Sequence, residues 1–305
     1  MINKKKLVSI GMPVFNGENF IRQALDSLLA QKYENFEINI SDNASTDKTE
    51  KICKEYLAKD DRVHYYRNNR NMGAGVNFKR VLDLSKGEYF MWAACDDMWH
   101  SDFISSCVKI LEDNKNIGMA FSNIVNINSF GQIIRKYPSF EQFSGINNTK
   151  IISNYVKDPE IMGKANLIYS VYKLNSFKKT WDSFPLTEDW GSDMSFVLST
   201  ISRSGIGIDK RVLFQKRIAK KSDQENYPQE KIVKNPKRHI FPLNESFKYI
   251  KNNLRAVKNT KYYFIVLNIM INKLPRVFWN FFLNKINRLI YLIKKIINKL
   301  KRSTK

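Results

Sequence analysis

Cysteine is scarce in this chain of 305 residues, which contains only three. Cys53, Cys95 and Cys107 are an odd number and lack the Cys-x-x-Cys spacing of many zinc sites. They indicate neither a disulfide framework nor a zinc site, and they favour a reducing compartment such as the cytoplasm.

Long apolar runs are also missing. The run Leu7–Val14 is broken by Pro13, so we expect no signal peptide. A second run, Tyr262–Ile271, is interrupted by Asn268, and Pro275 ends its pattern. A bilayer-spanning helix needs roughly twenty apolar residues. The sequence therefore predicts no membrane-spanning segment.

Negative charge is absent from the last sixty residues. No Asp or Glu follows Glu245, although the chain carries a net charge of +22. Fifteen of these positive charges lie after Glu245, which leaves +7 for the first 245 residues. From Val277 onward, apolar residues recur at helical steps with basic residues opposite them. They are Phe278, Phe282, Ile286, Leu289, Ile293, Ile297 and Leu300. This pattern predicts an amphipathic helix on an anionic membrane surface, or else one packed on the rest of the chain or in a dimer.

Strand-like and helix-like segments alternate through the first half of the chain. The strands are expected at Leu7–Val14, Phe36–Ser41, Val63–Tyr66, Glu88–Ala94 and Met119–Ile127, and the helices at Glu18–Gln31, Asp47–Leu57, Ala74–Leu84 and Asp102–Leu111. This alternation predicts an α/β fold with a mainly parallel sheet covered on both faces. Between Gln132 and Asp158 the periodicity fades, so we expect loops or a flexible flap there. Further on, Ser192–Ser202 is helix-like and Val212–Gln215 strand-like.

Two adjacent carboxylates, Asp96 and Asp97, follow the apolar strand Glu88–Ala94. Open α/β folds bind ligands at the carboxyl ends of their strands, so the pair is expected at a ligand-binding edge. Adjacent acids repel each other unless a cation or proton lies between them. Mg²⁺ and Mn²⁺ prefer such oxygen ligands. The alternative is that the pair only caps the helix near Ser101.

Three other loops follow strands of the predicted sheet. Asp42 begins the polar stretch Asp42–Asp47 and can accept hydrogen bonds from a nucleobase or a ribose, or simply form a turn. Pro13–Gly17 ends in a turn, and Arg67–Gly75 supplies amides, glycines and two arginines before a helix. Such features suit phosphate binding. Neither the P-loop nor the dinucleotide-binding glycine pattern is present.

In this order, the motifs resemble those of the inverting glycosyltransferases of family 2, which have the GT-A fold. The matching pieces are Val8–Asn16, Ser41–Asp47, Asn71–Gly73, Lys86–Tyr89 and Cys95–Asp97. The similarity covers roughly residues 6–217. It implies a Rossmann-like sheet flanked by helices and transfer of a sugar from a nucleotide diphosphate to an acceptor hydroxyl. We expect a GT-A catalytic domain over residues 1–245 and a basic helical tail over residues 246–305.

The resemblance also assigns roles to individual residues. Asp42 matches the acid that contacts the nucleotide base, Asp96 the metal-binding acid of the family's DxD-type element, and Asp97 the acid after it. The other positions expected at the nucleotide sugar are Pro13, Phe15, Asn16, Asn71 and Gly73. The sequence departs from the family at Ala94, where many relatives carry the first Asp. This change implies fewer carboxylates for the expected Mn²⁺ or Mg²⁺.

An inverting transfer needs a general base, and a carboxylate can serve. The dipeptide Glu188-Asp189 has the appearance of the family's Glu-Asp pair, so Asp189 is one candidate. Asp193 is the other, and we favour it because it leads directly into the helix after it. Either acid is alternatively explained as a helix-start acid that the helix dipole favours.

The implied function is assembly of a bacterial surface polysaccharide or glycolipid. The expected partners are a nucleotide-sugar donor, a glycan or lipid-linked acceptor and an anionic membrane at the inner face of the cell membrane, with no specific nucleic acid. Two other hypotheses remain from the sequence. One is a nucleic-acid-binding protein, which rests on charge alone. The other is a catalytically silent scaffold, which the alanine at position 94 raises.

Overall fold

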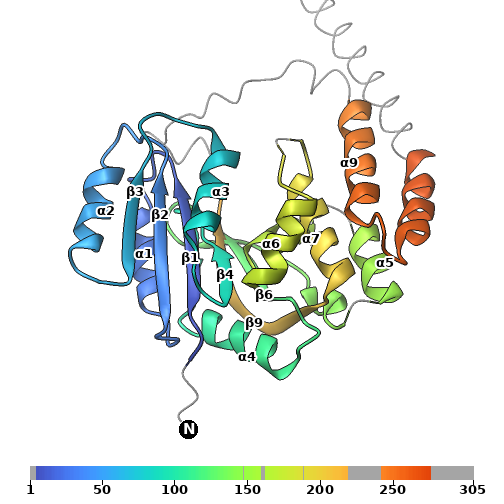
Figure 1. Cartoon of the computed structure of the whole chain (residues 1–305), viewed down its shortest axis with the longest axis horizontal. Helices are drawn as coiled ribbons and strands as arrows, with labels where there is room; N and C mark the ends of the chain where they lie inside the picture. Colours follow the sequence, from blue (N-terminus) through green and yellow to red (C-terminus); the bar gives the residue numbers. More distant parts are fainter. Residues whose placement is uncertain (1–4, 147, 159–161, 188, 219–241, 276–305) are drawn as a thin grey trace, which may run out of the picture.

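The computed structural model describes residues 5–146, 148–158, 162–187, 189–218 and 242–275, and in these residues nine strands form a single sheet. Four parallel strands lead the chain: β1 (Val8–Val14), β2 (Phe36–Asp42), β3 (Val63–Arg67) and β4 (Tyr89–Trp92). The helices between them are α1 (Ile21–Leu29), α2 (Thr49–Leu57) and α3 (Ala74–Leu84). Figure 1 shows α3 in front of the sheet and α1 behind it.

The rest of the sheet is mixed. After β5 (Met98–Trp99) and α4 (Phe103–Asp113) come β6 (Met119–Ile127), β7 (Ile133–Lys136), β8 (Val171–Lys173), α6 (Leu174–Ser183), α7 (Ser192–Arg203) and β9 (Ile206–Arg217). The described strand order is β3-β2-β1-β4-β8-β6-β9-β5, with β7 beside β6. Strand β8 runs antiparallel to both β4 and β6, while β6 and β9 are parallel. The carboxyl ends of β1, β2, β4, β6 and β9 therefore lie at one edge. The predicted mainly parallel sheet is confirmed.

Aromatic packing joins the sheet to the helices on one face. Trp92 at the end of β4 is fully buried, with ring centroids 4.9 Å from Phe177 on α6 and 6.2 Å from Phe196 on α7. Such edge-on contacts add to the hydrophobic stabilisation that burial provides. This cluster fixes α6 and α7 against β4, the strand that leads to the acid pair.

The loops predicted between Gln132 and Asp158 are the main error of the sequence-based assignment. This region contains β7, a 3₁₀ turn η1 (Phe140–Phe143) and helix α5 (Thr149–Lys157). Asn148 caps α5, since its Oδ1 accepts a hydrogen bond from the Ile151 amide at 3.0 Å. The helix is short and buries only one narrow apolar face, so its periodicity is hard to recognise. A second 3₁₀ turn, η3 (Lys164–Tyr169), leads into β8.

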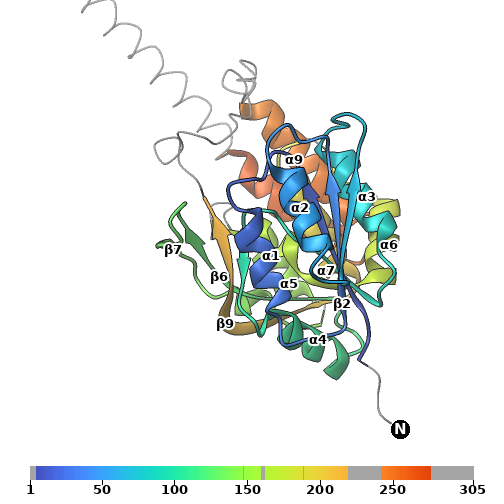
Figure 2. The same cartoon turned by 90° about the vertical axis from the view of Figure 1, so that its left-hand side faces the viewer.

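The C-terminal part that is described packs on α7 and α5. Helix α9 (Pro242–Ala256) contacts α7, and residues 263–275 form a further helix beside it (Figures 1 and 2). Tyr249, Val257, Tyr262 and Val266 are buried in the same core as the sheet. The predicted amphipathic pattern from Val277 onward lies outside the described residues. Within the described ranges, no helix is long and apolar enough to cross a membrane.

Candidate functional site

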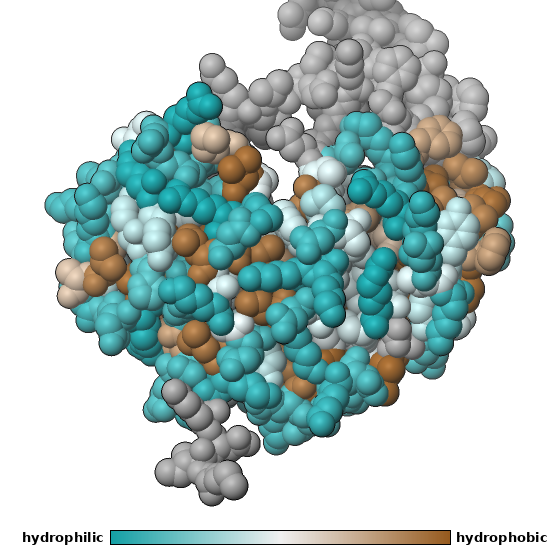
Figure 3. Space-filling model, in the orientation of Figure 1, coloured by the Kyte–Doolittle hydropathy of each residue, from teal (hydrophilic) through white to brown (hydrophobic). Residues whose placement is uncertain are grey.

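The residues predicted to bind a ligand lie at the carboxyl edge of the sheet. In Figure 1 this edge is at the top, opposite the N-terminus, and Figure 3 shows the surface notched there between the α3 side and the α9 side. The loops after β1, β2, β3 and β4 and the carboxyl end of β9 lie at this edge because these strands run in the same direction.

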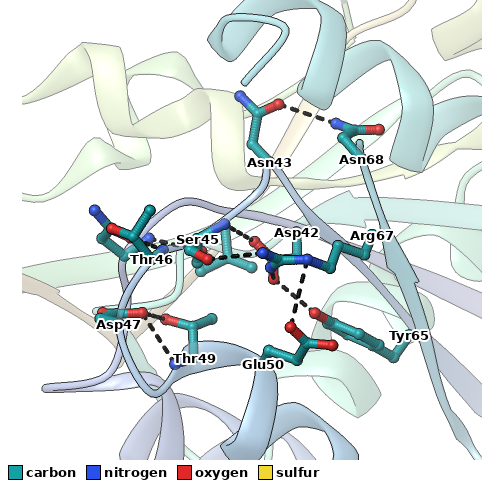
Figure 4. A network of polar contacts seen from close by, with 12 residues as sticks. Asp42, Asn43, Ser45, Thr46, Asp47, Thr49, Glu50, Tyr65, Arg67 and Asn68 are labelled. Atoms are coloured by element: carbon teal, nitrogen blue, oxygen red, sulfur yellow. Dashed lines mark hydrogen bonds and ion pairs between the residues drawn. The ribbon is translucent and has the colours of Figure 1, made fainter. Parts of the chain in front are cut away.

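Asp42, the last residue of β2, is completely buried among polar partners (Figure 4). Its Oδ1 accepts a hydrogen bond from the Ser45 amide at 2.8 Å. Its Oδ2 accepts bonds from the Tyr65 hydroxyl and from Arg67 Nη1, both at 2.6 Å. Arg67 also donates to the Ser45 carbonyl and lies 3.4 Å from Glu50. In this arrangement Asp42 shapes the loop, and contact with a nucleotide base requires one of these partners to move.

Asparagines connect the neighbouring loops. The Asn16 amide donates to Ser45 Oγ at 2.9 Å, and Asn43 Nδ2 donates to Asn71 Oδ1 at 2.7 Å. Asn16 and Gly73 adopt left-handed backbone angles, with φ of 53° and 85°, which Asn and Gly tolerate best. Asn43 was not singled out from the sequence, although it lies inside a recognised motif.

The remaining predicted nucleotide-site positions border the same loops. Pro13 is half-buried on β1, while Phe15, Asn71 and Gly73 are exposed. The structure thus brings Pro13, Phe15 and Asn16 of the first loop beside Asp42 of the second. An exposed rim of this kind is accessible to a ligand.

The acid pair follows β4, and its two carboxylates differ in environment. Asp96 is half-buried, whereas Asp97 is fully buried. Asp97 Oδ1 accepts a hydrogen bond from the Arg217 amide at 2.8 Å, and Oδ2 lies 3.5 Å from Lys216 Nζ. Burial raises the pKa of Asp97 to about 7, against the opposing effect of Lys216. The N-cap residue of α4 is Asp102 and not a member of the pair.

Arg217 holds the acid-pair loop in place from the end of β9. The side chain is almost entirely buried, and its Nε donates to the Asp96 carbonyl at 2.9 Å. Its Nη1 donates to the Asn128 carbonyl at 2.8 Å, and the guanidinium lies 4.4 Å from the Phe20 ring centroid. Because these bonds use fixed carbonyls, they position the Asp96 backbone without using its carboxylate.

Lys216 and Tyr169 complete the inner wall of the site. Lys216 Nζ lies 4.8 Å from the Tyr169 ring centroid. Burial opposes the positive charge of Lys216, but Tyr169, Asp97 and Asp96 together raise its pKa, so it stays protonated. Neither residue was singled out from the sequence. The basic pair Lys216-Arg217 just past the predicted strand was the only available signal.

The two candidate bases differ clearly in their surroundings. Asp189 Oδ1 accepts a hydrogen bond from Lys248 of α9 at 2.9 Å, and this bond lowers the pKa of Asp189. Asp193, in the first turn of α7, is half-buried, and its Oδ1 accepts a bond from the Met194 amide at 2.7 Å. Burial raises the pKa of Asp193, and Lys216 lies within electrostatic range of it. Glu188 lies outside the described residues.

The acid pair fits a hard divalent cation in its chemistry but offers few protein ligands. Asp96 is reachable, and Asp97 Oδ2 accepts no hydrogen bond from the described residues. In that part of the chain no group of three or more His, Cys, Asp or Glu side chains is arranged to hold a metal. The acid pair would therefore supply two carboxylates from the described part of the chain, and a bound diphosphate would supply further oxygens.

Comparisons with known proteins agree with this geometry. A sequence model of the family described as "Glycosyl transferase family 2" matches residues 9–174. The uncharacterized glycosyltransferase RT0329 of Rickettsia typhi is 41% identical over 113 residues, which cover 36% of this chain and 34% of that protein. The putative teichuronic acid biosynthesis glycosyltransferase TuaG of Bacillus subtilis is 34% identical over 102 residues, covering 33% of this chain and 40% of TuaG. The matches thus span less than half the length of both relatives.

Solved structures show the same fold. S. aureus TarS, residues 1–349 in complex with UDP-GlcNAc, superposes with a TM-score of 0.64 at 17% identity. The match covers 89% of this chain and 72% of that one. The GT-A fold expected from the sequence is therefore confirmed.

Proposed function

Because the chain belongs to glycosyl transferase family 2, we propose that it transfers a sugar from a nucleoside diphosphate to an acceptor hydroxyl, with inversion at the anomeric carbon. One observation carries the proposal. The loops around Asp42, the acid pair and the half-buried Asp193 come from distant parts of the chain and belong to a single edge of the sheet.

We assign the general base to Asp193. The acceptor oxygen attacks the anomeric carbon as the bond to the diphosphate breaks, and the bonding electrons leave with the diphosphate. Asp193 takes the proton from the attacking hydroxyl. Its Oδ1 is already held by the Met194 amide, so Oδ2 is the oxygen available to the acceptor. A raised pKa makes Asp193 a stronger base than an exposed aspartate. Asp189 is less suited, because its bond to Lys248 weakens it as a base.

The donor's nucleotide is proposed to lie on the loops after β1, β2 and β3. Pro13, Phe15, Asn16, Asn71 and Gly73 border this surface. Before the nucleotide binds, Asp42 holds the loop together. Asp42 would contact the nucleobase once its bond to Tyr65 or Arg67 is broken.

A Mn²⁺ or Mg²⁺ ion is proposed as the cofactor, and Asp96, with Asp97 behind it, would hold it. When bound, such an ion neutralises charge on the leaving diphosphate. Asp96 fits this role better than Asp97, whose Oδ1 is committed to the Arg217 amide.

The biological setting is proposed to be assembly of a surface polysaccharide or glycolipid at the inner face of the cell membrane. The name of TuaG, a relative in teichuronic acid biosynthesis, supports the polysaccharide, and the UDP-GlcNAc complex of TarS supports a nucleotide-sugar donor. The acceptor is then a glycan or lipid-linked saccharide. The proposed tail comprises residues 246–305, and the end of this tail would contact the anionic membrane.

A donor screen tests the activity. The protein is incubated with UDP-, GDP-, CDP- and dTDP-sugars and Mn²⁺, and mass spectrometry follows transfer and hydrolysis. We expect turnover of one donor and its loss in Asp96→Ala. Absence of turnover with every donor would count against an active enzyme and in favour of a silent scaffold.

A further inference from the structure

Lys216 stands out as a cation built into the interior of the proposed site. It is the next-to-last residue of β9, and its Nζ lies 3.5 Å from Asp97 Oδ2 and 4.8 Å from the Tyr169 ring centroid. A quarter of the side chain remains exposed, while Asp97 behind it is fully buried. The ammonium group is thus held from within and still accessible to a ligand.

The charges around the acid pair explain why this cation matters. Asp97 is already compensated by Lys216 and by the Arg217 amide. The Arg217 guanidinium donates to the Asp96, Asn128 and Ser129 carbonyls and to Gln23, so its donors are directed at the protein. Among the described residues around the acid pair, Lys216 is therefore the cation that is held in place by its contacts and is still partly open to solvent.

A diphosphate bound at Asp96 would bring two or more negative charges to a place where a carboxylate already stands. Ala94 reduces the number of carboxylates available to a metal, and a compensated Asp97 reduces their charge further. A divalent ion is consequently held less firmly here than by uncompensated acids. An ammonium group, in contrast, binds phosphate oxygens directly as a point charge.

We propose that Lys216 binds the donor diphosphate directly, so that nucleoside diphosphates bind without a divalent metal and the metal adds to an affinity that already exists. This inference rests on the proposed function, since it takes the diphosphate to lie at the acid pair. The contacts with Asp97 and Tyr169 fix the lysine before the ligand arrives, which lowers the entropic cost of binding.

Titration calorimetry with UDP, GDP, CDP and dTDP, each in EDTA and in Mn²⁺, tests the proposal. We expect the wild-type protein to bind one of them in EDTA. Lys216→Met should weaken that binding by about tenfold or more, the loss expected for one charge-assisted hydrogen bond, and should weaken binding in Mn²⁺ less. Lys216→Arg, which keeps the charge, should retain binding in EDTA.

Lys210→Met is the matched control. Lys210 lies on the same strand, is exposed and pairs with Glu141 at the surface, so its loss should leave binding unchanged. Lys216→Met leaves the buried Asp97 without its cation and can reduce stability. If Lys216→Met does not fold, the double variant Asp97→Asn, Lys216→Met replaces it, because it removes both charges. We expect the double variant to bind nucleoside diphosphates in EDTA as weakly as predicted for Lys216→Met.

Three results separate the possibilities. Binding of the wild type only in Mn²⁺ would overturn the role of Lys216, and so would unchanged binding of Lys216→Met, or of the double variant, in EDTA. If none of the four nucleotides binds in either condition, the proposed function itself fails.

Discussion

At the scale of single residues, the environment of a carboxylate decides its chemistry. Asp193 and Asp189 are four positions apart in the sequence, yet burial raises the pKa of Asp193 and a lysine lowers the pKa of Asp189. A base must hold its proton in the product state, so a higher pKa favours Asp193. The contrast between the two acids provides a direct test.

Asp193→Asn is expected to lower kcat by about a hundredfold or more, the usual contribution of a general base. Asp189→Asn removes the surface ion pair with Lys248, while the new side chain can still accept the bond from Thr187, so it should change kcat little. Steady-state kinetics of the two variants on the donor found in the screen provides the measurement. A larger loss in Asp189→Asn would reverse the assignment.

The pH dependence of the wild type follows from the same pKa. Asp193 must be deprotonated to act as a base, and its pKa is raised above 3.8, the usual value for an aspartate. Activity should therefore fall as the pH drops through this raised pKa, so the acid limb of kcat/KM lies above pH 3.8. That limb should be absent from the residual activity of Asp193→Asn. An unchanged limb in the variant would assign it to another group.

Asp96→Ala tests whether the carboxylate of Asp96 takes part in the reaction. Its side chain is half-buried, and its backbone carbonyl accepts a bond from Arg217 Nε that the substitution keeps. We expect kcat/KM in Mn²⁺ to fall by about a hundredfold or more, as for loss of a preorganised charge, with little change in the unfolding midpoint. Asp113→Ala, an exposed acid at the end of α4, is the control and should retain full activity. Equal activity of the two variants would remove Asp96 from the mechanism.

At the scale of elements, the position of α7 depends on its contact with α9. Gly191 precedes α7 with φ of 77°, and a Cβ atom there would lie 2.6 Å from Tyr249 Cδ2 of α9. Gly131 has nearly the same φ, 80°, but nothing lies within 4 Å of its Cβ position. These two glycines separate backbone strain from steric overlap.

Gly131→Ala should cost about 1 kcal/mol of unfolding free energy, from the backbone alone. Gly191→Ala should cost about 1–3 kcal/mol more, because it also overpacks the contact with Tyr249. Urea unfolding of both variants measures the difference. Equal losses would mean that α9 moves away at little cost and does not hold α7.

The sequence predicted the first half of the fold better than the second, and the reason is physical. Strands β1, β2 and β4 are buried on both faces and alternate with amphipathic helices, so each leaves a local pattern. Helix α5 and η3 depend on contacts with α7, which is distant from them in sequence. The acid pair was placed at the correct edge, but Asp97 and its partner Lys216 are 119 positions apart, and such a pairing leaves no local pattern.

At the scale of the whole molecule, the positive charge is concentrated toward the C-terminus. The described helices of this region are part of the core, since Val257, Tyr262 and Val266 are buried. Figure 3 shows apolar surface over the last described helix, where Phe264 is 77% and Ile271 52% exposed. In the sequence, this helix is followed by residues 276–305, which carry nine Lys or Arg and no acid.

Removal of residues 276–305 is expected to separate membrane binding from folding. The shortened protein keeps the buried Val257, Tyr262 and Val266, so we expect it to keep the unfolding midpoint and the nucleotide affinity of the full chain. Each basic residue near an anionic surface contributes about 1 kcal/mol, so the loss of nine should abolish binding to phosphatidylserine vesicles in a flotation assay. The full chain should bind these vesicles in a salt-sensitive manner and ignore neutral phosphatidylcholine vesicles. If the shortened protein still floats with the vesicles, the membrane contact must be assigned to the exposed face of Phe264 and Ile271. If the full chain binds DNA in a salt-sensitive manner but does not bind vesicles, a nucleic-acid partner is favoured instead.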